Sequence, residues 1–338
     1  MLARTGDRPI ELVGGVVAFN EEHRLASAVQ SLLEQKLPPG IRWRAIWIVA
    51  SGCTDGTPRV AESLSARHPE VRTMVQPERR GKASALGDIL RAARGDFLVL
   101  LNADAVAGPG AVSALLAAAE PLAAPYAVMG RPEPAALPRG SIGRSLHLLW
   151  SLHHRLHEDM FAAEEGTHLS DELLLLPTSD LPPLPEDIVN DGAFIGAWLK
   201  TRGGQLVYCP DARVAIEVPS DLGDHLRQRR RILFGHQQVT DRVGVTPTTF
   251  GEYLRRHPRR ALQVLWEEVR ATPGGVTALA ELGVGELASL SAAWWDRVPP
   301  RRNHRLWETI RDSAGSPDAF ESTGVRTSAS RAPSGRAE

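Results

Sequence analysis

The stretch RGKASALGDILRAARGDFLVLLNADA (Arg80–Ala105) decides the fold, because a helix pattern in it runs directly into a short buried strand. Leu86, Ile89 and Leu90 recur at the three- and four-residue spacing of a helix with one apolar face. Gly95 follows this pattern. We therefore expect a helix that ends at Gly95, with the glycine as a left-handed cap residue.

The run after this helix, Phe97–Leu101, is wholly apolar and short, which is typical of a strand covered on both faces. Asn102, Ala103 and Asp104 follow it at once. In open α/β sheets, ligands bind beyond the carboxyl ends of the strands. A carboxylate there can hold a divalent cation against a phosphate. Asp104 is therefore either a metal ligand or a turn or cap residue.

The upstream segments repeat this alternation. Apolar runs at Leu12–Phe19, Trp43–Ala50 and Val71–Gln76 predict strands, and amphipathic segments between them predict helices. Short polar loops, residues 20–22 and 51–57, follow the first two strands. The pattern predicts an α/β fold with a mostly parallel central sheet, and a nucleotide would lie across its strand ends.

The bulk composition excludes several classes of protein. The chain has 338 residues, 43% hydrophobic and 23% charged, and a formal net charge of -1, so we expect a globular protein without a nucleic-acid partner. Its two cysteines form no metal-ligand spacing and favour a reducing, cytoplasmic setting. No apolar run reaches the length of a signal peptide at the start or of a membrane span elsewhere, so neither is expected.

The chain divides into four parts by pattern. Residues 1–9 are an N-terminal tail and 10–245 an α/β domain. Residues 246–312 show helical patterns only and are expected to form a small C-terminal helical appendage. Residues 313–338 are rich in Ser, Ala, Gly, Pro and Arg, a composition typical of a disordered tail.

Five groups of polar residues are candidates for chemistry, each with a structural alternative. Asp55 either lines a nucleotide pocket or caps the next helix. Asp191 is either a general base or the N-cap of the helix after it. The basic run 227–231 either clamps phosphates or forms a solvated face. Lys82 either approaches a bound ligand or is solvated. His236 is either an extra metal or phosphate contact or a helix-surface residue.

One predicted helix carries several histidines. Ser145–Phe161 has a leucine-rich apolar face that includes Leu149 and Leu152. His153 and His157 share a helix face, but no acidic or cysteine partner accompanies them. We therefore expect a binding cleft or a solvated face there rather than a metal site.

Five blocks of sequence, in this order, resemble family 2 glycosyltransferases of the GT-A fold over roughly residues 10–240. Within them, RGDFLVLLNADA looks like the family's strand ending in the metal-binding DxD motif. NDGAFIGAWLKTRGGQLVYCPDA looks like the acceptor-side block that supplies the catalytic Asp, and residues 228–232 look like its QxxRW box. The blocks are FNEE (Phe19–Glu22), SGCTDGT (Ser51–Thr57), Arg80–Ala105, Asn190–Ala212 and LRQRRRI (Leu226–Ile232).

The resemblance implies a GT-A nucleotide-binding fold and a Mg²⁺ or Mn²⁺ cofactor. Asp191 would be the catalytic base and Asp104 the metal ligand, with His236 as the extra contact noted above. The residues expected to bind the nucleotide-sugar donor are Phe19, Asn20, Glu21, Ser51, Asp55, Lys82, Asn102, Ala103, Asp104, Gln228, Arg230 and Arg231.

The chain departs from the family pattern at four places. Asn102 stands at the first position of DxD, and Ala50-Ser51 replaces a usual acidic pair that would face a uracil. Asn190 replaces the Glu before the catalytic Asp, and Ile232 replaces the final Trp of the QxxRW box.

The resemblance implies an inverting, metal-dependent transfer of one sugar, with UDP-sugar favoured, to a hydroxyl of a small-molecule or lipid-linked acceptor. The apolar helix pattern Leu279–Trp295 either packs on the protein or lies on the inner face of a membrane. One alternative is a sugar nucleotidylyltransferase, which we disfavour because the acidic FNEE block would repel a triphosphate. The other is a degenerate transferase that acts as a non-catalytic partner.

Overall fold

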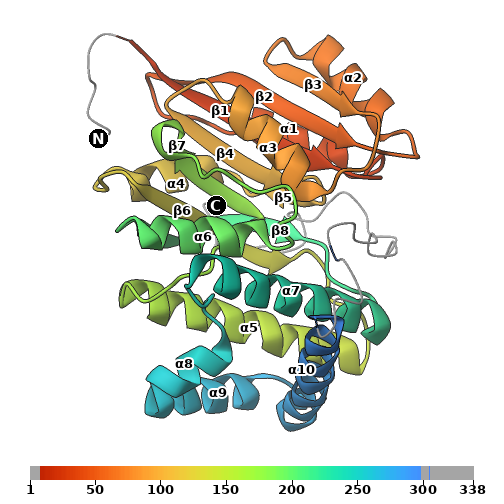
Figure 1. The fold of residues 1–338 in the computed structure, drawn as a ribbon, viewed down its shortest axis with the longest axis vertical. Helices are drawn as coiled ribbons and strands as arrows, with labels where there is room; N and C mark the ends of the chain where they lie inside the picture. Colours follow the sequence, from red (N-terminus) through yellow and green to blue (C-terminus); the bar gives the residue numbers. More distant parts are fainter. Residues whose placement is uncertain (1–7, 298–303, 305–338) are drawn as a thin grey trace, which may run out of the picture.

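The computed structural model describes residues 8–297 and 304, and these form one eight-stranded sheet with helices packed on it (Figure 1). The strand order is β3-β2-β1-β4-β7-β6-β8-β5. The strands are β1 (Ile10–Ala18), β2 (Ile41–Ser51), β3 (Val71–Gln76), β4 (Phe97–Asn102), β5 (Ala105–Ala107), β6 (Tyr126–Pro134), β7 (Leu173–Pro177) and β8 (Gln205–Ile216).

Strands β1 to β4 are parallel, as the alternation predicts. Leu12 and Val16 of β1 pack in one core, and Val13 packs in the other, so the strand is buried on both faces. The helices are α1 (Leu25–Leu33), α2 (Thr57–Arg67), α3 (Lys82–Ala92), α4 (Ala111–Ala119), α5 (Ser141–Ala162), α6 (Asp191–Thr201), α7 (Leu222–Val243), α8 (Phe250–Arg256), α9 (Pro258–Ala271) and α10 (Gly275–Arg297). The predicted α/β fold with a mostly parallel sheet is confirmed.

The predicted role of Gly95 is wrong. Helix α3 ends with Ala93 as its cap residue, in an extended conformation, and Gly95 is not among the residues with positive φ. A Cβ at Gly95 would lie 2.8 Å from the carbonyl oxygen of Glu11. The glycine is therefore required by the close approach of two backbones rather than by a left-handed turn.

Strand β7 runs antiparallel to both of its neighbours, β4 and β6. Leu173, the first residue of β7, pairs with Leu101 near the end of β4, and the Asn102 amide donates to the Glu172 carbonyl at 3.2 Å. An antiparallel strand begins at the edge where its parallel neighbours end. Residues just before β7 therefore join the carboxyl edge of the sheet.

The C-terminal helices pack against helices of the predicted α/β domain, on the side away from β3 (Figure 1). Helix α10 lies against α7 and α5. Arg229 of α7 donates to Glu286 of α10 at 2.6 and 2.9 Å, and Arg230 pairs with Asp296. The boundary at residue 245 remains a prediction, and the proposed tail 313–338 lies outside the described residues.

Helix α10 is, within residues 8–297, the one helix long and apolar enough to cross a membrane by length and composition, and 22% of its apolar window is buried. The sequence did not lead us to expect such a helix. Several large apolar side chains on α9 and α10 are exposed to solvent: Leu262, Trp266, Val276, Val284, Leu287, Leu290, Trp294 and Trp295.

Candidate active site

A cavity of about 690 Å³ lies at the carboxyl edge of the parallel strands and continues beneath α5, α7 and α10. It is lined by the loops after β1, β3 and β4, by Ser51 at the end of β2, by the start of α6, and by one side of α7. The predicted site residues that line it are Phe19, Glu21, Ser51, Lys82, Asn102, Ala103, Asp104, Asp191, Gln228, Arg231 and His236.

Three predicted site residues do not line this cavity. The Asn20 side chain bonds with Thr54, and Asp55 accepts hydrogen bonds from the amides of Glu22 and Thr57. These contacts fasten the loops after β1 and β2 to each other, which matches the capping alternative for Asp55. Arg230 points to α10 instead, where it pairs with Asp296.

The side chain of Asn190, rather than that of Asp191, caps α6, since its Oδ1 accepts a bond from the Ala193 amide at 2.9 Å. Asp191, the first residue of the helix, is only 6% exposed and faces the cavity. A Cβ at Gly192 would lie 2.2 Å from the Leu169 carbonyl oxygen. This glycine therefore lets the start of α6 approach the segment before β7, which carries Asp171.

Lys82 binds both carboxylates of this centre. Its Nζ lies 3.2 Å from Asp191 Oδ2 and makes a close ion pair with Asp171. Burial and the negative charge of Asp171 raise the pKa of Asp191 to about 6, while Lys82 acts in the opposite direction. The Lys82 charge brings the pKa of Asp171 down to about 2, although burial opposes it. The centre therefore contains one firmly ionised carboxylate and one that titrates near neutral pH.

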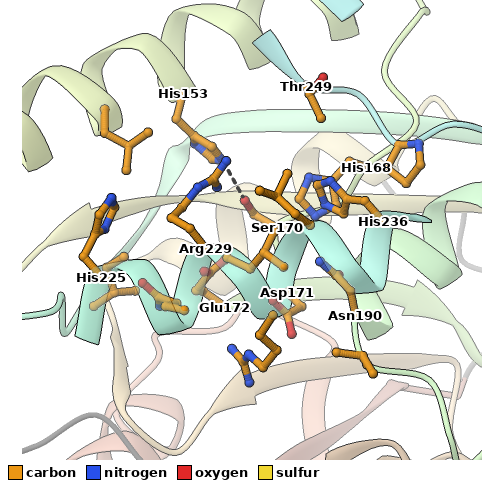
Figure 2. Close-up of a pocket in the computed structure, with 18 of the residues that line it drawn as sticks. His153, His168, Ser170, Asp171, Glu172, Asn190, His225, Arg229, His236 and Thr249 are labelled. Atoms are coloured by element: carbon orange, nitrogen blue, oxygen red, sulfur yellow. Dashed lines mark hydrogen bonds between the residues drawn. The ribbon is translucent and has the colours of Figure 1, made fainter. Parts of the chain in front are cut away.

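Glu172 supplies another carboxyl group on the cavity wall, close enough to Asp104 for that charge to affect it. Burial, followed by the charge of Asp171, raises the pKa of Glu172 to about 8. Its Oε2 is buried and has no hydrogen-bond partner among the described residues. Figure 2 shows Asp171 and Glu172 side by side at this edge.

These carboxyl groups fit the expected metal. A divalent cation beside Asp104 would bring positive charge to the orphaned oxygen of Glu172 and favour its ionised form. Within residues 8–297, no three His, Cys, Asp or Glu side chains form a ready-made metal site. Oxygen atoms of a bound diphosphate would therefore have to complete the coordination.

Positive groups face these carboxylates across the cavity. The charges of Asp104, Asp171 and Asp191 all act on the guanidinium of Arg231, whose pKa is lowered by burial. Arg229 also lines the cavity while it pairs with Glu286. Guanidinium groups at this point can bind phosphate oxygens through charge-assisted hydrogen bonds.

A cation–aromatic pair forms another part of the wall. The Arg79 guanidinium lies over the Phe19 ring, 3.6 Å from its centroid. Ser51, also on the wall, donates through its hydroxyl to Gln76 at 2.6 Å. The Phe19 ring and the Arg79 guanidinium are flat groups that can stack on a nucleobase.

Three histidines form a further part of the cavity wall (Figure 2). His153 bonds with Ser170 at 3.2 Å, and the rings of His168 and His236 pack edge to face with centroids 4.7 Å apart. Burial, more than any other cause, lowers the pKa values of these three histidines, to about 4 for His168 and well below the usual value for the other two. All three are therefore neutral near pH 7, and a metal-binding role for His236 remains a prediction.

Asp171 and Glu172 are functional candidates that the sequence reasoning missed. They precede the apolar run Leu173–Pro177, and polar groups before a strand lie at the opposite edge if the strand is parallel. The orientation of β7 reverses that expectation. The pair of acidic residues directly before a buried apolar run was the one available signal, because helix α5 precedes β7 just as a helix would precede a parallel strand.

Comparison with known families gives a match over most of the α/β region. A family model described as "Glycosyltransferase like family 2" matches residues 14–235. The matched range contains the strand-end loops, Asp104, Asp191 and the basic run 227–231 of α7, and it ends just before His236.

Curated relatives match over shorter segments. Glycosyltransferase AglD of Haloferax volcanii is 32% identical over 89 residues, which are 26% of this chain and 14% of AglD. Beta-monoglucosyldiacylglycerol synthase of Synechocystis sp. is 33% identical over 92 residues, 27% of this chain and 19% of the synthase. The match thus spans less than a fifth of either relative.

A solved structure matches over nearly the whole chain. Mannosyltransferase PcManGT from Pyrobaculum calidifontis, in complex with GDP-Man and Mn²⁺, superposes with a TM-score of 0.60 and 20% sequence identity. The superposition covers 87% of this chain and 88% of that one. At this identity the similarity establishes the fold.

Proposed function

Because this chain belongs to glycosyltransferase family 2, we propose that it is an inverting, metal-dependent enzyme that transfers one sugar from a nucleotide-diphosphate sugar to an acceptor hydroxyl. The observation that carries the proposal is the presence of Asp104 and Asp191 on the wall of one cavity, although they are far apart in the sequence.

Asp191 is the general base of this reaction. As the acceptor oxygen forms its bond to the anomeric carbon, its proton passes to the Asp191 carboxylate. The bond between that carbon and the diphosphate oxygen breaks on the opposite side, so the configuration inverts. A base with a pKa of about 6 is mostly ionised at pH 7 and can still accept a proton efficiently. Lys82 and Asp171 hold it in place.

The leaving diphosphate gains negative charge, which Arg231 and Gln228 stabilise by hydrogen bonds from the α7 side. Asp104 would hold a Mg²⁺ or Mn²⁺ that neutralises the same charge as a Lewis acid. The similar mannosyltransferase structure holds GDP-Man and Mn²⁺, which supports a metal-bound donor here. In this proposal the Phe19–Arg79 pair and Ser51, which share the cavity wall, contact the base, and the family resemblance favours uracil.

The acceptor is a small-molecule or lipid-linked hydroxyl compound. The name of the Synechocystis relative refers to a diacylglycerol, which supports the lipid-linked class. Exposed Trp266, Trp294 and Trp295 support peripheral contact with a membrane from the cytoplasmic side. The intact Lys82–Asp171–Asp191 centre argues against a non-catalytic partner.

The test is Asp191→Asn, assayed as Mn²⁺-dependent hydrolysis of UDP-, GDP- and dTDP-sugars. Loss of the base should reduce kcat by about 10²- to 10⁴-fold while nucleotide affinity is unchanged. The matched control is Asp187→Asn, which removes a half-exposed carboxylate paired with Arg242 outside the cavity. An Asp191→Asn enzyme with the activity of the control contradicts the assignment.

A further inference from the structure

The far end of the cavity is apolar and is not filled by protein. Its walls come from α5, α9 and α10, and we name this part the leucine chamber. It is lined by Leu149, Leu152, Leu265, Leu279, Leu282 and Leu290. Leu265, Leu279 and Leu282 remain partly accessible although they point inward. Since protein interiors are normally filled to crystal density, an open apolar space of this kind is suited to an apolar guest.

The leucine chamber is continuous with the catalytic centre, because one cavity is lined by both Asp191 and Leu282. The neutral His153, His168 and His236 line the same cavity, and Figure 2 shows them around the pocket that Asp171 and Glu172 also line. Both ring nitrogens of His236 are buried without a hydrogen-bond partner in the described part of the chain. A neutral imidazole can accept a bond from a hydroxyl group and donate one to it. The cavity thus combines carboxylates, hydroxyl-binding groups and hydrocarbon on one continuous wall.

The leucine chamber also opens to the surface. Leu290 lines the cavity and is 38% exposed, and Gly283 lines it with open space where a side chain would begin. This opening lies on α10, whose outer face carries the exposed Val284, Leu287 and Trp294. A chain leaving the chamber would therefore meet apolar side chains of α10, while the charge of Glu286 on the same wall is paired with Arg229.

We propose that the acceptor is an amphipath whose hydroxyl-bearing head lies at Asp191 and His236 and whose single aliphatic chain occupies the leucine chamber. The proposal rests on the proposed function, since it names the acceptor of the same site. The chain is chosen over a second sugar ring because the chamber wall offers leucine side chains from three helices rather than aligned polar groups.

The first test measures binding of 1-O-butyl-, hexyl- and octylglycerol by calorimetry, below their critical micelle concentrations and without donor. Each buried methylene should tighten binding by up to about fourfold, so octylglycerol should bind at least about tenfold more tightly than butylglycerol. Equal affinities across the series overturn the proposal.

The second test fills the leucine chamber. Gly283→Trp places an indole at its mouth, and Val284→Trp is the matched control, because Val284 is 70% exposed and does not line the cavity. The filled variant should lose the dependence on chain length, whereas the control should keep it. Leu282→Glu, which puts a charge on the wall, is expected to act like Gly283→Trp and serves if that variant does not fold.

A third variant separates the chamber from the outer surface. Trp294→Ser removes an exposed ring and should leave the dependence of alkylglycerol affinity on chain length unchanged. The proposal is overturned if Trp294→Ser loses this dependence while Gly283→Trp retains it. Nucleotide-sugar hydrolysis by the wild type is measured in parallel. If the enzyme hydrolyses a donor but binds all alkylglycerols equally, the result contradicts only the proposed acceptor site in the chamber. If binding depends on chain length but no donor is hydrolysed, the result contradicts the proposed transferase function.

Discussion

The part of the cavity where we propose that the donor binds, which we call the donor edge, is built from strand ends, whereas the leucine chamber is built from helix faces. Phe19, Ser51 and Asp104 each follow or end a parallel strand, so a rigid and doubly buried backbone fixes their positions. The chamber depends on how α5, α9 and α10 pack on one another. If the donor and the acceptor bind as proposed, the sheet fixes the donor site, while acceptor preference can change through the helices without disturbing it.

The largest effect is expected from a substitution at the donor edge that should leave the leucine chamber unaffected. Asp104→Asn should lower kcat/KM for the donor by about 10²- to 10³-fold, because the metal would lose its proposed charged ligand and the diphosphate would lose the cation that neutralises it. Calorimetry of nucleotide diphosphate with Mn²⁺ should show weaker binding, while octylglycerol binding is unchanged. The control is Asp96→Asn, at the other end of β4, where the carboxylate pairs with Arg8. Equal Mn²⁺-dependent nucleotide affinity in both variants would remove Asp104 from the metal site.

A smaller effect is expected from Lys82, a positioning residue. Lys82→Met leaves Asp171 and Asp191 without their shared cation, so the pKa of Asp191 should rise by about one unit or more. The measurement is the pH dependence of kcat. Its acidic limb should move to higher pH, and kcat at pH 7 should fall at least about twofold, because a base with a pKa of about 7 is only half ionised at that pH. A lowered kcat with an unmoved limb would mean that Lys82 acts only through structure.

The next prediction concerns how the rate of the wild-type enzyme depends on pH. The pKa of Asp191 is raised to about 6 by burial and by Asp171, and the base must be ionised to act. The rate should therefore be at its plateau above pH 7 and should fall about tenfold per pH unit well below pH 6. Binding of octylglycerol should vary much less between pH 5 and 7, because the histidines near the chamber stay neutral. A flat rate profile across this range contradicts the role of Asp191.

The smallest effect on activity is expected where α7 meets α10. Arg230→Ala leaves the buried Asp296 without its guanidinium partner and should cost about 1–2 kcal/mol of unfolding free energy. Donor hydrolysis should change less than about twofold, since Arg230 does not line the cavity. Chemical denaturation and the hydrolysis assay measure the two quantities. A large loss of hydrolysis at unchanged stability would instead support the sequence-based prediction that Arg230 binds the donor.

The donor edge was largely predictable because its residues sit at the ends of apolar runs. The run before Asn102 and the block beginning at Asn190 placed Asp104 and Asp191 correctly at one edge. The direction of β7 was not predictable, because an apolar pentapeptide carries no information on orientation, and Asp171 and Glu172 were missed with it. The sequence left Asp191 as either a general base or the cap of α6; the side chain of Asn190, which was not considered, provides the cap, and Asp191 pairs with Lys82.

The leucine chamber could not be predicted at all. Leu149 and Leu152 follow the same helical spacing whether their face packs on protein or lines an open space. The same limit applies to the basic run of α7, where adjacent arginines have different partners. Arg229 and Arg231 line the cavity, whereas Arg230 joins Asp296. Only the packing of neighbouring helices decides these roles.

The most direct measurement of the central claim is the anomeric configuration of the transferred sugar. Proton NMR of the first product formed from an α-linked nucleotide sugar, taken before mutarotation, reports it without knowledge of the natural acceptor. A single displacement assisted by Asp191 predicts a β-configured product. An α-configured first product would require a mechanism in which Asp191 is not the base of a direct attack, and would contradict the account.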